Sequence, residues 1–80
     1  MSNEFTIKIR TIEGVKQVAN ICEGFTNDVD IKSGRYIVDA KSIMGILAFD
    51  LNKDLTIKIH SDEYEVINRF NEMLKDFKVV

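Results

Sequence analysis

The chain has 80 residues, 45% of them hydrophobic and 30% charged, a balance typical of one ordinary globular domain spanning residues 1–80 rather than of a disordered or membrane protein. Its 11 basic and 13 acidic residues give a formal net charge of −2, so no global field recruits nucleic acid or an anionic membrane.

The first elements are predicted by a change of hydrophobic period. Residues 5–10 (FTIKIR) alternate between apolar and polar side chains, the period of a half-buried strand. Residues 13–23 carry apolar side chains at three- and four-residue steps, which indicates a helix. Thr11 is the candidate amino-terminal cap, and Gly24 is placed to end the helix in a left-handed conformation.

A hairpin follows this helix. Residues 28–32 (DVDIK) and 35–39 (RYIVD) flank Ser33-Gly34, a two-residue turn in which glycine supplies the positive φ that hairpins require. Counting outward from that turn pairs Ile31 with Tyr36 and Val29 with Val38, with all four side chains on one face.

The second half of the chain predicts three more elements. Residues 42–49 could form about two helical turns, with Ser42 as the cap. Residues 55–60 (LTIKIH) alternate cleanly, with Leu55, Ile57 and Ile59 inward. Asp62 and Glu65 resemble a capping box that opens a final helix running to the end. Its apolar stripe consists of Val66, Ile67, Phe70, Met73, Leu74 and Phe77.

Together, these hydrophobic periodicities and the turn predict the element order β-α-β-β-α-β-α. Each of the four strands offers a single apolar face, so the helices should cover one face of an antiparallel sheet and leave the other to water. The expected fold class is therefore α+β, an open-faced β-sandwich with a four-stranded antiparallel sheet.

The sequence lacks the residues that several functional classes require. Cys22 is the single cysteine, so it has no partner for an internal disulfide, and thiolate metal sites need several ligands. No nucleophile-base pair and no glycine-rich phosphate loop is recognisable, so we expect no metal, no cofactor and no enzymatic activity. The start, MSNEFTIKIR, lacks the layout of a secretory signal, and we expect a cytoplasmic protein without a membrane partner.

The stretch KSIMG at residues 41–45 resembles the corresponding motif of the HPr family, the histidine-containing phosphocarriers of the bacterial phosphotransferase system. The element order and the position of LTIKIH agree with the HPr fold, so the resemblance covers nearly the whole chain. It implies a phosphoryl group carried on a histidine at the start of the first helix, within a Gly-x-His-Ala-Arg-Pro motif, where backbone N–H groups stabilise the phosphate.

The sequence departs from the family at that place. It reads RTIEGVKQV, with no histidine and no Arg-Pro pair, and the only histidine, His60, follows the fourth predicted strand. We therefore expect a variant that lacks the active-site histidine and is not competent for histidine phosphotransfer. A still-active phosphocarrier with a displaced acceptor is the alternative. Lys16 could replace the motif's arginine toward a partner, although a solvated helix charge also accounts for it.

Ser42 matches the serine of the Lys-Ser-Ile-Met-Gly motif. In HPr proteins of Gram-positive bacteria this serine is phosphorylated by HPr kinase, and the phosphoserine form binds a catabolite-control transcription regulator. The resemblance therefore implies that Ser42 is a regulatory phosphoacceptor, with the kinase or a transcription regulator as protein partners. A role as helix cap alone explains Ser42 equally well. The catabolite-repression paralogues of HPr, which also lack the histidine, provide a precedent.

The apolar run from Ile43 to Phe49 exceeds what a short helix can bury. Ile46 and Phe49 can face the sheet, but Ile43, Met44 and Leu47 cannot all share that side. An exposed patch centred on methionine suits a partner surface, because the thioether side chain adapts to differently shaped neighbours. We expect these three residues, together with Lys16, to bind a protein partner.

A single-stranded RNA-binding module is the rival function. The basic residues expected on the water-facing side of the sheet are Lys8, Arg10, Lys58 and His60. RNA modules, however, stack bases on aromatic side chains, and the alternation sends Phe5 and Tyr36 inward. Asp28 and Asp30 on the neighbouring strand oppose phosphate binding. We therefore expect a protein-docking or regulatory module with no nucleic-acid partner, and the oligomeric state stays open.

Overall fold

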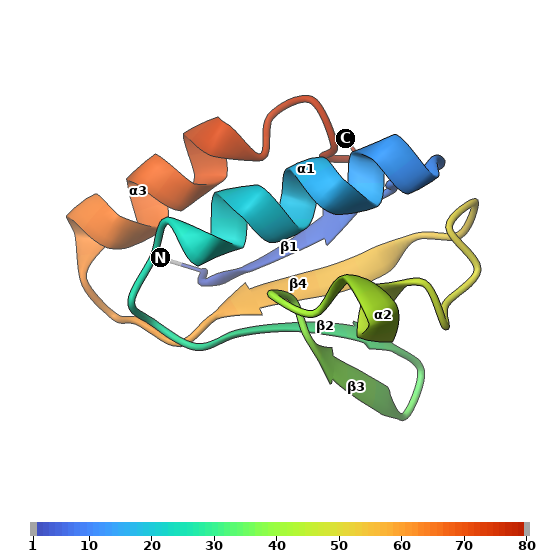
Figure 1. Ribbon diagram of the computed structural model, residues 1–80. Coiled ribbons are helices and arrows are strands. Elements are labelled where there is room, and N and C mark those ends of the chain that lie inside the picture. The colour runs from blue at the N-terminus through green and yellow to red at the C-terminus, as the bar shows by residue number, and fades with distance from the viewer. Residues whose placement is uncertain (1, 80) are drawn as a thin grey trace.

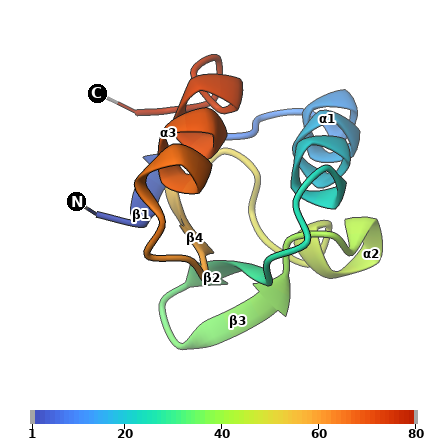
Figure 2. The same cartoon turned by 90° about the vertical axis from the view of Figure 1, so that its left-hand side faces the viewer.

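The computed structural model describes residues 2–79 and confirms the α+β fold class, with a four-stranded antiparallel sheet and three helices (Figure 1). The elements in chain order are β1 (Glu4–Ile7), α1 (Ile12–Glu23), β2 (Val29–Ser33), β3 (Tyr36–Asp39), α2 (Ile43–Ile46), β4 (Leu55–Ile59) and α3 (Tyr64–Met73). The strand order across the sheet is β1-β4-β2-β3, and each neighbouring pair is antiparallel. Figure 2 shows α1 and α3 side by side over the sheet, with α2 close to β3.

The core lies between the sheet and the helices, because β1, β2 and β4 turn their apolar positions to the helical side. The alternation in β4 and the stripe of α1 are confirmed, since both place their apolar side chains inside. The fully enclosed side chains include Ile7, Val15, Val18, Ile31, Ile46, Leu55, Ile57, Ile59, Phe70 and Leu74, none more than 1% exposed. The prediction that these residues form the core is therefore confirmed.

The first strand is shorter than the alternation predicts. It ends at Ile7, because the Lys8 N–H donates to the Phe77 carbonyl at 2.9 Å and the Arg10 N–H donates to the Leu51 carbonyl at 2.8 Å. Neither bond goes to β4, so the pairing of β1 with β4 stops at Ile7, and Arg10 precedes α1 with a positive φ of 73°.

One cap of α1 is confirmed and the other is wrong. Thr11 Oγ1 accepts from the Gly14 N–H at 2.9 Å, as an amino-terminal cap should. Gly24, predicted to be left-handed, instead has a φ of −72° and continues the right-handed turn, with its N–H donating to the Ile21 carbonyl. The glycine is therefore not required there by backbone conformation.

The predicted hairpin register is wrong by two residues. The turn is Gly34-Arg35 rather than Ser33-Gly34, with Gly34 at a φ of +59° as its first central residue. Ile31 therefore pairs with Val38, and Ser33 pairs with Tyr36. A shift of two residues keeps every side chain on its predicted face, which is why the core survives the error.

The last helix begins and ends differently from the prediction. Its cap position is Glu63, which makes no side-chain cap bond, so the capping box of Asp62 and Glu65 is wrong. The helix ends at Met73, which is exposed rather than part of the buried stripe. The chain then turns back along β1, where the Val79 N–H donates to the Thr6 carbonyl at 2.9 Å. This segment covers the outer edge of β1.

Candidate functional site

The start of α2 is fixed by a group of local hydrogen bonds. Asp39 Oδ1 accepts from the Lys41 N–H at 2.9 Å, and the Asp39 carbonyl accepts from the Ser42 N–H at 3.0 Å. Ser42 Oγ in turn accepts from the Gly45 N–H at 3.1 Å, so Ser42 is the helix cap that the sequence predicts. The Lys41 ammonium donates to the Phe25 carbonyl at 2.8 Å and ties this segment to the loop after α1.

Burial of Ile46 decides which side of α2 faces outward. The Ile46 side chain is enclosed, so the opposite side of this single turn points to solvent. Ile43 and Leu47 are each 40% exposed and Met44 is 82% exposed. We call these three residues the α2 patch. The prediction that they could not all be buried is confirmed by their exposure.

Gly45 lets α2 approach β3 closely. A Cβ added at Gly45 would lie 3.2 Å from Val38 Cβ, which is tighter than ordinary contact. The glycine of KSIMG therefore sets how closely α2 packs against β3, and with it the position of the α2 patch.

Lys16 and the α2 patch meet at one hollow. A surface depression of about 400 Å³ between α1 and α2 is lined by Glu13, Lys16, Gln17, Asn20 and Ile43. The structure thus brings together Lys16 and Ile43, which are separate predictions from the sequence. Gln17 and Asn20 are missed by the sequence analysis. Their spacing of one helical turn along the polar face of α1 is the signal that could have found them.

His60 lies away from the start of α1. Because β1 and β4 are antiparallel, α1 begins near the Leu55 end of β4, whereas His60 follows the other end. The His60 N–H donates to the Asp28 carbonyl at 2.8 Å, and His60 Nε2 lies 2.6 Å from Asp30 Oδ2. The helix start itself presents Thr11, Ile12 and Glu13.

The basic side chains of the open sheet face are partly paired with carboxylates. Lys8 Nζ lies 3.6 Å from Asp54 Oδ1, and His60 contacts Asp30 as described. Phe5 points inward, as predicted, with its ring centroid 6.1 Å from that of Phe70. Tyr36 is wrongly predicted to be buried, because β3 is an edge strand and leaves it 69% exposed.

Comparison with known proteins identifies the family. The family model described as PTS HPr component phosphorylation site matches residues 3–76. The chain belongs to the HPr family. No curated protein is significantly similar to it in sequence.

Solved HPr structures share the fold. The chain is similar to the crystal structure of HPr-C-His from Thermoanaerobacter tengcongensis, with a TM-score of 0.72, 20% identity, and coverage of 91% of this chain and 90% of that chain. It is also similar to the histidine-containing phosphocarrier protein of a mycoplasma, with a TM-score of 0.68, 18% identity, and coverage of 91% and 92%. The HPr-type open-faced sandwich expected from the element order is thereby confirmed.

HPr-family proteins carry a phosphoryl group within the phosphotransferase system and work by contacting other proteins. Within residues 2–79, no group of three or more His, Cys, Asp or Glu side chains could hold a metal ion. The helices in this part of the chain are all too short or too polar to cross a bilayer.

Proposed function

We propose that this HPr-family chain is a protein-docking module that does not carry phosphohistidine, and that phosphorylation of Ser42 regulates its docking. The observation that carries the proposal is the α2 patch, whose central residue, Met44, is 82% exposed. Several large apolar side chains exposed side by side, as Ile43, Met44 and Leu47 are, are typical of an interaction surface.

The absence of histidine phosphotransfer is inferred from the position of the only histidine. Phosphoryl transfer through phosphohistidine requires an imidazole, and His60 is the single histidine of the sequence. It lies at the other end of β4 from the start of α1, where the helical N–H groups would stabilise a phosphate. One of those N–H groups, that of Gly14, donates instead to the Thr11 hydroxyl.

The docking surface combines an apolar patch with a polar hollow. The α2 patch adjoins the hollow between α1 and α2, where the Lys16 ammonium and the Glu13 carboxylate can pair with charged groups of a partner. Apolar contact at the centre and charged contact at the rim is the usual anatomy of a protein interface. By resemblance to other HPr proteins, the partners are an HPr kinase and a transcription regulator in the cytoplasm.

Ser42 is placed so that a phosphate can be added without loss of the cap. Its hydroxyl oxygen already accepts from the Gly45 N–H, and a phosphate on that oxygen provides further acceptors for the same donor. The modification adds a charge of about −2 beside the apolar α2 patch, which changes the partners that the surface accepts.

Intact-mass spectrometry tests the phosphorylation. The protein is incubated with phosphoenolpyruvate and the general phosphotransferase enzyme, and separately with ATP and HPr kinase. We expect one ATP-dependent phosphate that is lost in Ser42→Ala. Ser61→Ala is the matched control, because Ser61 is also half-buried and its Oγ accepts from the Glu63 N–H at 3.1 Å. Phosphate transfer from phosphoenolpyruvate would refute the proposed loss of the carrier role.

Binding to a purified partner tests the docking surface. Met44→Lys should weaken binding of the HPr kinase by about tenfold or more, since it places a charge in the centre of the apolar contact. Met73→Lys on α3 is the control, because Met73 is also exposed but lies outside the α2 patch. Both variants should unfold at the temperature of the wild type. Equal binding by both variants would place the interface elsewhere.

A further inference from the structure

The two outer edges of the sheet differ in whether another part of the chain bonds to them. The outer edge of β1 is covered by the chain itself, through bonds from the Lys8 N–H to the Phe77 carbonyl and from the Val79 N–H to the Thr6 carbonyl. The outer edge of β3 is the other end of the sheet, and none of the strands in residues 2–79 pairs with it. Figure 2 shows β3 at the margin of the sheet.

The register shows which β3 backbone groups are unused. The Ala40 N–H donates to the Val29 carbonyl at 2.9 Å, so Ala40 and every second residue before it turn their backbone toward β2. Ile37 and Asp39 therefore turn theirs outward. The Asp39 carbonyl accepts from the Ser42 N–H, so among residues 2–79 the N–H and carbonyl of Ile37 and the N–H of Asp39 have no backbone partner at the edge.

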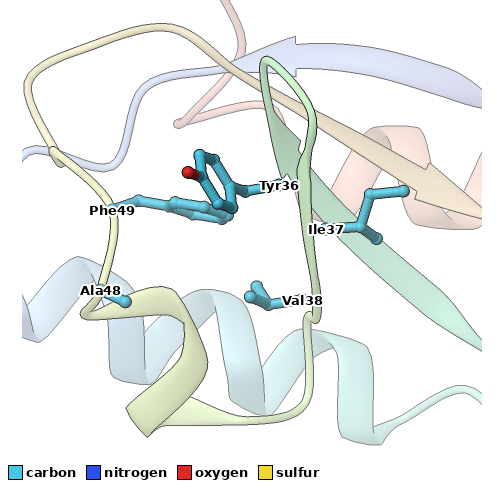
Figure 3. A pocket seen from close by; sticks show the side chains of 5 residues that line it. All are labelled: Tyr36, Ile37, Val38, Ala48 and Phe49. Atoms are coloured by element: carbon cyan, nitrogen blue, oxygen red, sulfur yellow. The ribbon is translucent and has the colours of Figure 1, made fainter.

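The side chains of this edge are apolar on both faces. Tyr36 is 69% exposed and Ile37 is 62% exposed, without the lysine or proline that commonly protects an edge strand. In Figure 3, Tyr36 lies beside Phe49 on the side of a cavity of about 310 Å³, and Ile37 points away on the opposite side. A second strand laid along β3 would cover both.

The charges at the two ends of β3, Arg35 and Asp39, form no ion pair with any of residues 2–79. Arg35 and Asp39 are exposed, and among residues 2–79 neither lies within 4.0 Å of an opposite charge. Four residue steps along an extended chain place them about 13 Å apart, so they do not pair with each other. Asp39 also stands directly opposite Asp30 of β2; Asp30 has Lys58 opposite it on β4 and contacts His60, whereas a cation beside Asp39 would have to come from a second copy.

We propose that two copies of this chain associate through their β3 edges, in an antiparallel pairing centred on Ile37. The stretch RYIVD is self-complementary in that register: Arg35 meets Asp39 of the second copy, Tyr36 meets Val38, and Ile37 meets itself. The free N–H and carbonyl of Ile37 bond to those of the second copy, and the two sheets join into one. The proposal concerns a different surface from the α2 patch and does not depend on its docking role.

The association is weak, because a strand of four residues buries little area. Interfaces at the lower end of the size range are transient, and we expect a dissociation constant on the order of 0.1–1 mM. Sedimentation equilibrium over a concentration series up to about 2 mM, at low salt, therefore suits the measurement. The apparent mass should rise from 9.2 kDa toward twice that value.

Charge exchange tests the register. Arg35→Asp and Asp39→Arg each place like charges opposite one another in a homodimer, so each variant alone should remain monomeric. An equimolar mixture of the two restores both ion pairs and should form the mixed dimer. Recovery in the mixture is specific to the proposed register, because no general loss of stability would produce it. Failure of the mixture to associate while both variants stay folded would overturn the pairing of Arg35 with Asp39.

A second variant leaves Asp39 and its bond to the Lys41 N–H intact. Ile37→Lys places two ammonium groups face to face at the centre of the pairing and should abolish the dimer. Ile12→Lys is the control, because Ile12 is 60% exposed on α1 and lies outside β3. In the wild type, exchange of the Ile37 amide should slow with rising concentration. A monomer at every concentration, a dimer that survives Ile37→Lys, or one lost only in Met44→Lys would refute the proposal.

Discussion

Replacing Ser42 with alanine separates its structural role from its proposed regulatory one. Ser42→Ala removes the oxygen that accepts from the Gly45 N–H at 3.1 Å and leaves that donor without its cap. Loss of a serine cap typically lowers the free energy of unfolding by about 1 kcal/mol. With an unfolding entropy of about 2.1 cal/mol/K per residue, 80 residues give about 0.17 kcal/mol/K, so the melting temperature should fall by about 6 °C.

Two further variants calibrate this value. Thr11→Ala removes the equivalent bond at α1, where Thr11 Oγ1 accepts from the Gly14 N–H at 2.9 Å, and should be destabilised to a similar extent. Ser42→Asp keeps an acceptor at the cap and should stay within about 0.5 kcal/mol of the wild type, because aspartate caps helices as well as serine does.

Urea unfolding followed by circular dichroism measures all four proteins. If Ser42→Ala matches the wild type while Thr11→Ala is destabilised, the cap at Ser42 contributes no stability and the reasoning fails. If the free energy of unfolding of Ser42→Asp falls as far as that of Ser42→Ala, the hydrogen-bond acceptor at the cap is not the source of the stability. In the expected pattern Ser42→Asp is as stable as the wild type and should also fail to accept phosphate. Loss of kinase-dependent phosphorylation in Ser42→Ala would then be due to the missing hydroxyl and not to lost stability.

Two other predictions concern buried positions. Gly14→Ala should lower the free energy of unfolding by about 1–2 kcal/mol despite the better helix propensity of alanine, because its Cβ would lie 2.7 Å from the Ile9 carbonyl oxygen. Gly24→Ala, with 3.3 Å to the Ile21 carbonyl oxygen, is the near-neutral control in the same urea experiment, and a stabilised Gly14→Ala would contradict the clash. Burial raises the pKa of the Cys22 thiol from 9.0 to about 12, against an opposing effect of Lys41. The unfolded chain ionises first, so above pH 9 the wild type should lose up to about 1.4 kcal/mol per pH unit relative to Cys22→Ala, and equal pH slopes would refute this.

The sequence predicts the elements whose burial has one dominant period. In β4 every apolar position faces the core, and so does the stripe of α1 formed by Val15, Val18, Ala19 and Cys22, because alternation or a helical stripe leaves only one side to bury. The exposure of the α2 patch follows from the same reasoning, since one helical turn cannot enclose five large side chains. The proximity of the α2 patch to Lys16 could not be predicted from periodicity, because it depends on how α1 packs beside α2.

The sequence prediction is wrong where two turn positions are equally suited to glycine, and where the end of an element depends on contacts with a segment far away in the sequence. Glycine can occupy either central position of a two-residue turn, and both registers bury the same face, so periodicity could not distinguish them. The end of α3 depends on β1, whose outer backbone groups bond to residues 77–79 after the chain turns back. That requirement is not visible in the apolar stripe of residues 66–77.

Asp39 connects the two proposed surfaces, and this determines which variants can distinguish them. Its backbone carbonyl and carboxylate hold the start of α2, while the same carboxylate brackets the free edge of β3. A substitution at Asp39 therefore affects both the position of Ser42 and the self-association. Ile37→Lys and Met44→Lys each change one exposed side chain on one surface. If docking is lost only in Met44→Lys and the dimer only in Ile37→Lys, the two surfaces act independently. Loss of both functions in either variant would make them one interface.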